Sequence, residues 1–169
     1  MAEIVERIEH ASGLGRWTLV RARPSPPLRH AVLRLEGYRE TGAAAAIVRR
    51  ETPFAGVPVI LVFGGGFALA DPATPDRWRP LARSFVAGLH ERPVLVAAGS
   101  APCCLQVDLA PPAARCAFGL DQDALRNRVV DLADLIGPEA ERLADRLASA
   151  RGWPARFAIV ERWIAARLI

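Results

Sequence analysis

Apolar residues follow one period before Pro112 and a different period after it. Before that proline, apolar and polar residues alternate in short runs, as they do in half-buried β-strands. After it, apolar residues recur every three or four positions, which is typical of α-helices with one buried face. We therefore predict an α+β protein, with a β-sandwich or β-barrel over residues 1–120 and a bundle of about three helices over residues 121–169.

The predicted strands are short and are separated by turn residues, which is typical of sandwiches and barrels. Prolines are frequent between Pro53 and Pro112. Because proline donates no backbone hydrogen bond, they favour strand edges and turns there and argue against long helices. The predicted strands cover residues 16–23, 30–38, 46–51, 57–63, 67–70, 84–89, 94–98 and 105–109.

Three helices are predicted in the last third of the chain. The first has its apolar face between Leu125 and Ile136, is capped at its start by Asp121 or Asp123, and is ended by Gly137-Pro138. The second covers residues 138–151, with acidic residues near its positive N-terminal end. Its predicted buried face consists of small and branched apolar residues, namely Ala140, Leu143, Ala144, Leu147 and Ala148.

The third predicted helix begins at Pro154 and is apolar on two sides, so it needs two neighbours. One neighbour is the rest of this chain, and we assign the other side to a dimer or interdomain surface. The residues of that predicted surface are Phe157, Ile159, Val160, Trp163 and Ile164. The first turn of this helix lacks the polar, base-reading side chains of a helix-turn-helix, so we interpret the last two helices as a packing pair. The helical pattern is unfinished at Leu168-Ile169, from which we expect a longer protein.

The charge distribution argues against direct nucleic-acid binding by this part of the protein. The net charge is +4, and all 22 basic residues are arginine. They are spread along the chain, and even the locally basic stretch 16–50 alternates arginine with apolar residues instead of forming a phosphate-tracking stripe.

No targeting or membrane segment is evident in the sequence. The N-terminus is too acidic for a signal peptide. The longest apolar stretch, Val57 to Ala70, is broken by Gly64, Gly65 and Gly66 and is too short to span a bilayer. Three cysteines make no disulfide framework. We therefore expect a cytoplasmic protein that has no membrane partner.

The residues that usually carry metal or catalytic chemistry are scattered. His10, His30 and His90 show no metal-ligand spacing, so no metal site is predicted. Cys103 and Cys104 are adjacent and must point to opposite faces of a strand, so we interpret them as small buried side chains. Since no catalytic signature is present, we predict no catalytic residues, no cofactor and no enzyme.

Two features bear on a binding pocket. The run from Phe63 to Phe67 lacks the ending of a phosphate loop, and its three glycines indicate a tight turn whose two phenylalanines line an apolar pocket. Gln106 and Asp108 share one face of a predicted strand. An inward Gln106 orients a ligand, whereas an outward one is merely solvated, and the sequence leaves both alternatives open.

The order of short motifs along the chain resembles the N-terminal sensor half of AraC/XylS-type transcriptional regulators. These motifs lie at Trp17, 23–24, 27–29, 36–40, 49–53, 61–64, 84–90, 106–111, 125–132 and 153–161, and they extend over nearly the whole chain. The resemblance implies a cupin-like β-domain that senses a small molecule or mediates dimerisation, followed by linker helices. In that family the helix-turn-helix DNA-binding domain follows those helices, and this sequence lacks it.

By this resemblance the chain is the regulatory domain of a homodimeric regulator, and it contacts DNA only through the absent C-terminal domain. We expect a small apolar effector in the β-domain. The side chains predicted to contact it are Trp17, Phe63, Phe67, Phe85, His90 and Gln106.

Two alternatives remain open, while the effector, the target genes and the sense of regulation are not specified by the sequence. The first alternative is a small cupin-like enzyme that uses His90, one of the adjacent cysteines and Asp108. The second is a ligand-free dimerisation module whose β-domain is filled by its own side chains. A cavity in the β-domain would discriminate against this second alternative.

Overall fold

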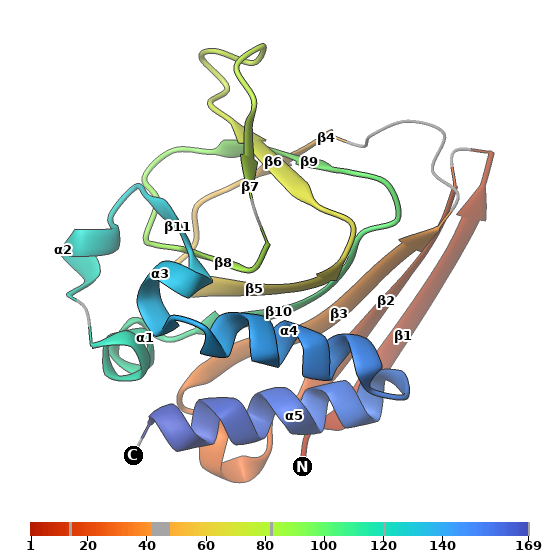
Figure 1. The fold of residues 1–169 in the computed structure, drawn as a ribbon, viewed down its shortest axis with the longest axis vertical. Helices are drawn as coiled ribbons and strands as arrows, with labels where there is room; N and C mark the ends of the chain where they lie inside the picture. Colours follow the sequence, from red (N-terminus) through yellow and green to blue (C-terminus); the bar gives the residue numbers. More distant parts are fainter. Residues whose placement is uncertain (14, 42–47, 82, 120, 169) are drawn as a thin grey trace.

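The computed structural model describes residues 1–13, 15–41, 48–81, 83–119 and 121–168. Within them the chain forms two antiparallel sheets and five α-helices, which confirms the predicted α+β class (Figure 1). Neither sheet closes on itself, so the described residues form two open sheets and a closed cupin-like barrel is not observed.

The larger sheet has seven strands in the order β1-β2-β3-β10-β5-β8-β11, and the smaller sheet has four in the order β4-β9-β6-β7. The strands of the larger sheet are β1 (Glu3–Ser12), β2 (Gly15–Arg23), β3 (Val32–Thr41), β10 (Cys103–Leu109), β5 (Val57–Gly64), β8 (Phe85–Ala87) and β11 (Val129–Asp131). Those of the smaller sheet are β4 (Val48–Glu51), β9 (Val94–Ala98), β6 (Phe67–Ala70) and β7 (Arg79–Leu81).

Most strands lie where the sequence predicts them. Strands β6 and β9 coincide with the predicted ranges, and β2, β3, β5, β8 and β10 overlap theirs. The predicted strand 46–51 is confirmed from Val48 onward as β4, while residues 46 and 47 lie outside the described residues. Strand β1 was not predicted, because it is an edge strand whose side chains are nearly all exposed and show no clear apolar alternation.

Strand β10 lies in the middle of the larger sheet, and its side chains alternate between two environments. Leu105 and Val107 are fully buried in the hydrophobic core under the helices. Cys104 and Gln106 instead line the space between the two sheets. One strand therefore supplies both the helix-facing core and the wall of a cavity.

Helices α4 (Glu139–Ser149) and α5 (Gly152–Arg167) cover one face of the larger sheet (Figure 1). The second predicted helix is confirmed as α4, and four residues of its predicted face, Ala140, Leu143, Ala144 and Leu147, are buried. Ala148 is exposed. The third predicted helix is confirmed as α5 and begins two residues before Pro154.

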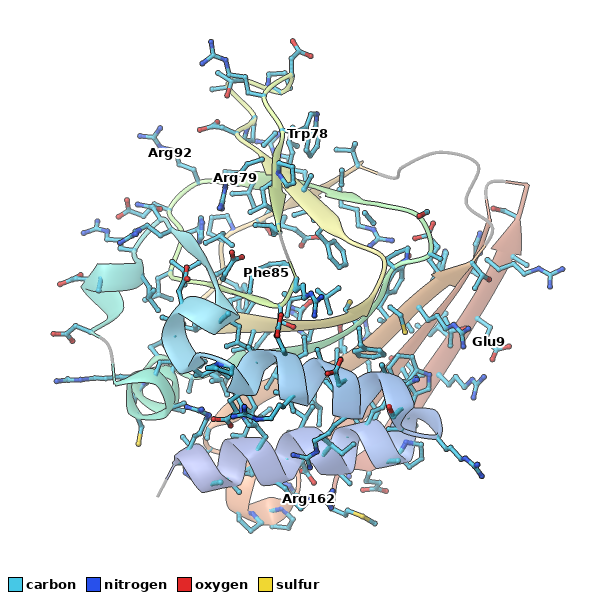
Figure 2. The ribbon with its side chains drawn as sticks, in the orientation of Figure 1. Glu9, Trp78, Arg79, Phe85, Arg92 and Arg162 are labelled. Atoms are coloured by element: carbon cyan, nitrogen blue, oxygen red, sulfur yellow. The ribbon has the colours of Figure 1, made fainter. Side chains whose placement is uncertain are left out.

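The prediction of a dimer or interdomain surface on α5 is wrong for most of its residues. Phe157, Val160, Trp163 and Ile164 are buried within this chain, and Ile159 is half-buried. The second neighbour that the two apolar stripes require is α4, where Glu139 accepts a hydrogen bond of 2.9 Å from the indole of Trp163. These side chains join the helices to the sheet and are not available to a second copy. The outward face of the helix carries Arg162 (Figure 2).

A buried carboxylate fastens α5 to the chain segments beside β1 and β2. Glu161 is 7% exposed. Its Oε1 accepts a hydrogen bond from the backbone N–H of Ser25 at 2.7 Å, and its Oε2 accepts one from the N–H of Ala2 at 2.5 Å. Burying this charge is tolerated because both oxygens are hydrogen-bonded.

The prediction of one continuous helix from Asp121 or Asp123 to Ile136 is wrong, although a helix does begin after Asp121. The predicted span contains α2 (Gln122–Leu125), then β11, then α3 (Leu132–Ile136). Asn127 has a φ of +53°, which interrupts a right-handed helix. The next residues pair with β8, whose edge would otherwise leave its backbone groups unpaired. Tertiary pairing therefore overrides the helical spacing of the apolar residues.

Helix α1 (Pro111–Phe118) was also not predicted. Its two prolines occupy the first turn, where a missing N–H costs nothing, so they start the helix instead of preventing it. Gly119, with a φ of +65°, ends it.

One hydrophobic cluster extends across the predicted boundary between residues 120 and 121. It includes Leu61 and Leu105 from the sheet together with Leu147 and Phe157 from the helices. In the described part of the chain, no helix combines the length and the apolar character needed to cross a lipid bilayer.

Candidate ligand site between the two sheets

A cavity of about 580 Å³ lies between the two sheets. The larger sheet contributes residues of β2, β3, β5, β8, β10 and β11 to its wall, and the smaller sheet contributes residues of β4, β6 and β9. Its volume is in the range typical of sites for small organic molecules. The apolar wall consists mainly of Trp17, Leu19, Ile60, Phe67, Leu69, Phe85, Val94 and Val96.

Five of the six side chains predicted to contact an effector line this cavity, namely Trp17, Phe67, Phe85, His90 and Gln106. Figure 2 shows Phe85 in the interior, between the two sheets. Trp17 lines the same cavity from β2, which β3, β10 and β5 separate from β8 in the larger sheet, and His10 stacks on its ring at 5.2 Å between centroids.

The placement of Phe63 in this pocket is wrong. Odd-numbered residues of β5 face the helices, so Phe63 packs edge-on against Trp153 at 6.4 Å and lies under Arg156 at 4.8 Å. The glycine run does form the predicted tight turn, because Gly65 has a φ of +65°. A side chain there would lie 2.7 Å from the carbonyl oxygen of Ser100.

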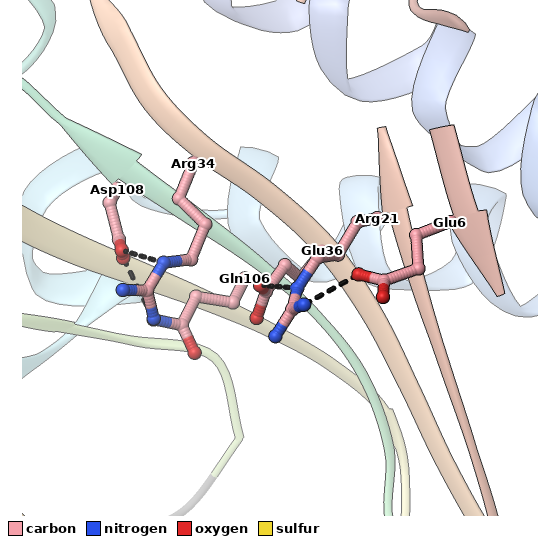
Figure 3. Close-up of polar contacts among 6 residues, drawn as sticks. All are labelled: Glu6, Arg21, Arg34, Glu36, Gln106 and Asp108. Atoms are coloured by element: carbon pink, nitrogen blue, oxygen red, sulfur yellow. Dashed lines mark hydrogen bonds and ion pairs between the residues drawn. The ribbon is translucent and has the colours of Figure 1, made fainter. Parts of the chain in front are cut away.

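Gln106 faces inward, which resolves the alternative left open by the sequence. Its Nε2 donates a hydrogen bond of 2.8 Å to Oδ1 of Asp108 (Figure 3). Since an ionised carboxylate only accepts hydrogen bonds, Asp108 fixes the amide orientation. Among the described residues, none donates a hydrogen bond to Oε1 of Gln106, so this acceptor remains available to the cavity.

Asp108 is a fully buried carboxylate beneath the cavity wall. Its Oδ2 forms an ion pair with Nε of Arg34 at 3.1 Å, without the geometry of a hydrogen bond (Figure 3). Burial raises the pKa of Asp108 above its ordinary value, while the Gln106 hydrogen bond and the Arg34 charge act in the opposite direction.

A second polar group in the cavity wall was missed by the sequence analysis. Nη2 of Arg49 on β4 donates to the hydroxyl oxygen of Tyr38 at 2.5 Å, and its guanidinium stacks over the Tyr38 ring at 4.7 Å. The Tyr38 hydroxyl in turn donates to Oε2 of buried Glu40 at 2.7 Å. Burial raises the pKa of Tyr38, and the hydrogen bond to Glu40 raises it further. The phenol therefore stays protonated and donates its hydrogen bond to Glu40.

Of the side chains required by the enzyme alternative, some line the cavity and others do not. His90 and Cys104 line the cavity, and Nδ1 of His90 lies 2.7 Å from the carbonyl oxygen of Gly88. Burial raises the pKa of Cys104 to about 12, so the thiol stays protonated near neutral pH and is a poor nucleophile. Cys103 packs on the helix side of the sheet, as expected for its neighbour on a strand.

No group of three metal-ligating side chains gathers within the ranges that the structure describes. His10 and His30 are exposed, whereas His90 is half-buried. Comparison of the sequence with known protein families and with curated proteins finds no match.

Proposed function

We propose that this chain is the effector-sensing domain of a transcriptional regulator of the AraC/XylS type. The observation that carries the proposal is the cavity of about 580 Å³ between the two sheets, which combines aromatic walls with a few oriented polar groups. The resemblance to these regulators supplies the regulatory role, and the DNA-binding domain that follows in that family would receive the signal.

The cavity favours this proposal over the two alternatives. A ligand-free dimerisation module requires a β-domain filled by its own side chains, and a cavity of this size does not fit that requirement. The enzyme alternative uses one of the adjacent cysteines, and burial raises the pKa of Cys104, the one that lines the cavity, to about 12, which makes its thiol a poor nucleophile near neutral pH.

A path for the signal runs from the cavity wall into the helices. Val129 lines the cavity on β11, which pairs with β8 beside Phe85. Helix α3 follows β11 directly, and the N–H of Leu132 donates to the carbonyl oxygen of Ser84 at 2.8 Å. Suppose that the protein has two states that differ in the position of β11. An effector with a higher affinity for one of these states would shift the protein toward it and so change the arrangement of the helices.

The proposal is tested by thermal unfolding of the protein against a broad panel of small metabolites. We expect at least one compound to raise the melting temperature, because a ligand that binds only the folded state stabilises it. Ala87→Trp places an indole in the cavity and should abolish this stabilisation. Ala148→Trp, on the exposed face of α4, should preserve it.

Two outcomes would contradict the proposal. One is a panel in which no compound stabilises the wild-type protein. The other is a stabilising compound whose effect persists in Ala87→Trp, since that compound would bind elsewhere.

A further inference from the structure

The charged groups of the cavity wall differ in how well they are neutralised. Arg34 is paired with Asp108, and Glu36 accepts a hydrogen bond of 2.7 Å from Arg21 (Figure 3). Arg92 and Glu51 also line the cavity but are exposed, and Arg92 extends away from the protein (Figure 2).

Arg49 is the exception inside the cavity. It is half-buried, and within the described ranges no carboxylate lies within ion-pair distance of its guanidinium. Among the residues of known placement, its guanidinium donates to the Tyr38 hydroxyl, and that hydroxyl donates in turn to Glu40. Glu51 lies two residues away on the same face of β4 without pairing to it.

The guanidinium is also held in a fixed orientation. Since a guanidinium only donates hydrogen bonds, the Tyr38 hydroxyl oxygen accepts from Arg49, while the hydroxyl proton is donated to Glu40. The guanidinium carbon also lies over the Tyr38 ring, 4.7 Å from its centroid, and this cation–π contact restricts the side chain further. A guanidinium has five N–H groups, and one of them is used by the residues that the structure describes, so a planar fork of donors remains for a ligand.

Part of the wall around this fork is apolar. Arg49 lies opposite Val96 in the smaller sheet, and Trp17 and Phe67 line the same cavity. Charge-assisted hydrogen bonds to a carboxylate are strong in such a setting, because water competes less. Of the other two arginines that the structure describes in the wall, Arg34 is paired with Asp108 and Arg92 extends away from the protein, so neither is free inside the cavity for a second acidic group on the ligand.

We propose that the ligand of the cavity is a monocarboxylic acid with an apolar body, and that Arg49 binds its carboxylate. This inference rests on the proposed function, because it requires that the cavity hold a ligand. The apolar body occupies the space between the aromatic side chains of β2, β6 and β8. A hydroxyl or N–H group on that body donates to Oε1 of Gln106.

The wild-type chain is titrated with a series of monocarboxylic acids that have aromatic or alicyclic bodies. Each acid is compared with its primary amide and with a dicarboxylic acid that has the same body. Binding is measured by calorimetry. We expect the best monocarboxylic acid to bind at least about tenfold more tightly than its amide and its dicarboxylic partner.

Arg49→Gln should weaken binding of that acid by about ten- to a hundredfold and leave binding of the amide nearly unchanged. Arg50→Gln is the matched control, because Arg50 is the next residue of β4 and is exposed outside the cavity. It should bind the acid as the wild type does. If Arg49→Gln does not fold, the comparison of acid and amide in the wild-type chain decides alone.

Equal affinity for acid and amide, or an unchanged acid affinity in Arg49→Gln, would overturn the assignment of Arg49. The assignment of Arg49 would also be overturned if none of the monocarboxylic acids binds. Failure of this inference is separable from failure of the proposed function, because a neutral metabolite whose stabilising effect is lost in Ala87→Trp would leave the proposed function standing.

Discussion

At the scale of single residues, the cavity depends on pairs of side chains that orient one another. Asp108 turns the amide of Gln106, and Tyr38 fixes the guanidinium of Arg49. In each pair the orienting partner, Asp108 or Tyr38, has a raised pKa, mainly because burial removes it from water. Orientation by a buried partner keeps a few polar groups in place within an otherwise apolar cavity.

The buried carboxylate of Asp108 should make stability depend on pH in a defined direction. Its pKa in the folded protein is raised above the ordinary 3.8, so its contribution to stability is present below that pH and is lost as the pH rises through the raised value. Asp108→Asn removes this titration. The free energy of unfolding of Asp108→Asn minus that of the wild type should therefore increase as the pH rises from 3.8 to the raised pKa of Asp108. At higher pH this difference should stay constant.

This dependence is measured by urea unfolding of both proteins at a series of pH values. Parallel curves for the two proteins across the window would show that Asp108 does not titrate with a raised pKa.

Single residues also show where sequence reasoning reaches its limit for the site. The aromatic positions and Gln106 were predicted, because strand alternation and residue type indicate an apolar pocket. Arg49 was missed, since which of the adjacent residues Arg49 and Arg50 faces inward depends on the pairing of β4 with β9. That pairing joins segments far apart in the chain, and no local pattern encodes it. The position of Phe63 was predicted wrongly because the glycine turn joins strands of two different sheets. Phe63, on β5, faces the helices, whereas Phe67, on β6 of the smaller sheet, lines the cavity.

At the scale of elements, the attachment of α5 rests on one buried side chain as well as on apolar packing. Glu161→Ala removes both hydrogen bonds to the backbone N–H groups of Ser25 and Ala2 and leaves these donors unpaired. We expect the free energy of unfolding to fall by about 3 kcal/mol, since hydrogen bonds to charged groups contribute ~1.5–3 kcal/mol each.

The loss is measured by chemical denaturation, with Arg162→Ala as the control because Arg162 is the adjacent, exposed residue. Equal stabilities of the two variants would mean that Glu161 does not hold the helix in place.

The elements that the sequence predicted correctly are those whose burial pattern is local. Helix α4 has a buried face at helical spacing, and β6 and β9 are short apolar runs between turn residues. Strand β11 was missed because its residues also fit a helical period, and the deciding factor is the free edge of β8. Strand β1 was missed because its exposed side chains carry no periodic signal.

At the scale of the whole molecule, the helices and the larger sheet share one hydrophobic core. Leu61 and Leu105 would lose their burial if the helices separated from the sheet, so the two segments should unfold together. We expect a single transition in urea, with the same midpoint whether it is followed by far-ultraviolet circular dichroism or by tryptophan fluorescence. Two resolved transitions would instead indicate independent units on either side of residue 120.

Under the proposed sensing function, the alternation of β10 has a consequence for engineering a biosensor from this protein. Its even-numbered side chains line the cavity or support its wall, and its odd-numbered side chains hold the helices. A library randomised at positions 104 and 106 would vary the recognised compound while preserving the contacts at 105 and 107. The residues that select the ligand and the residues that contact the helices therefore alternate along one strand, so the first set can be changed without changing the second.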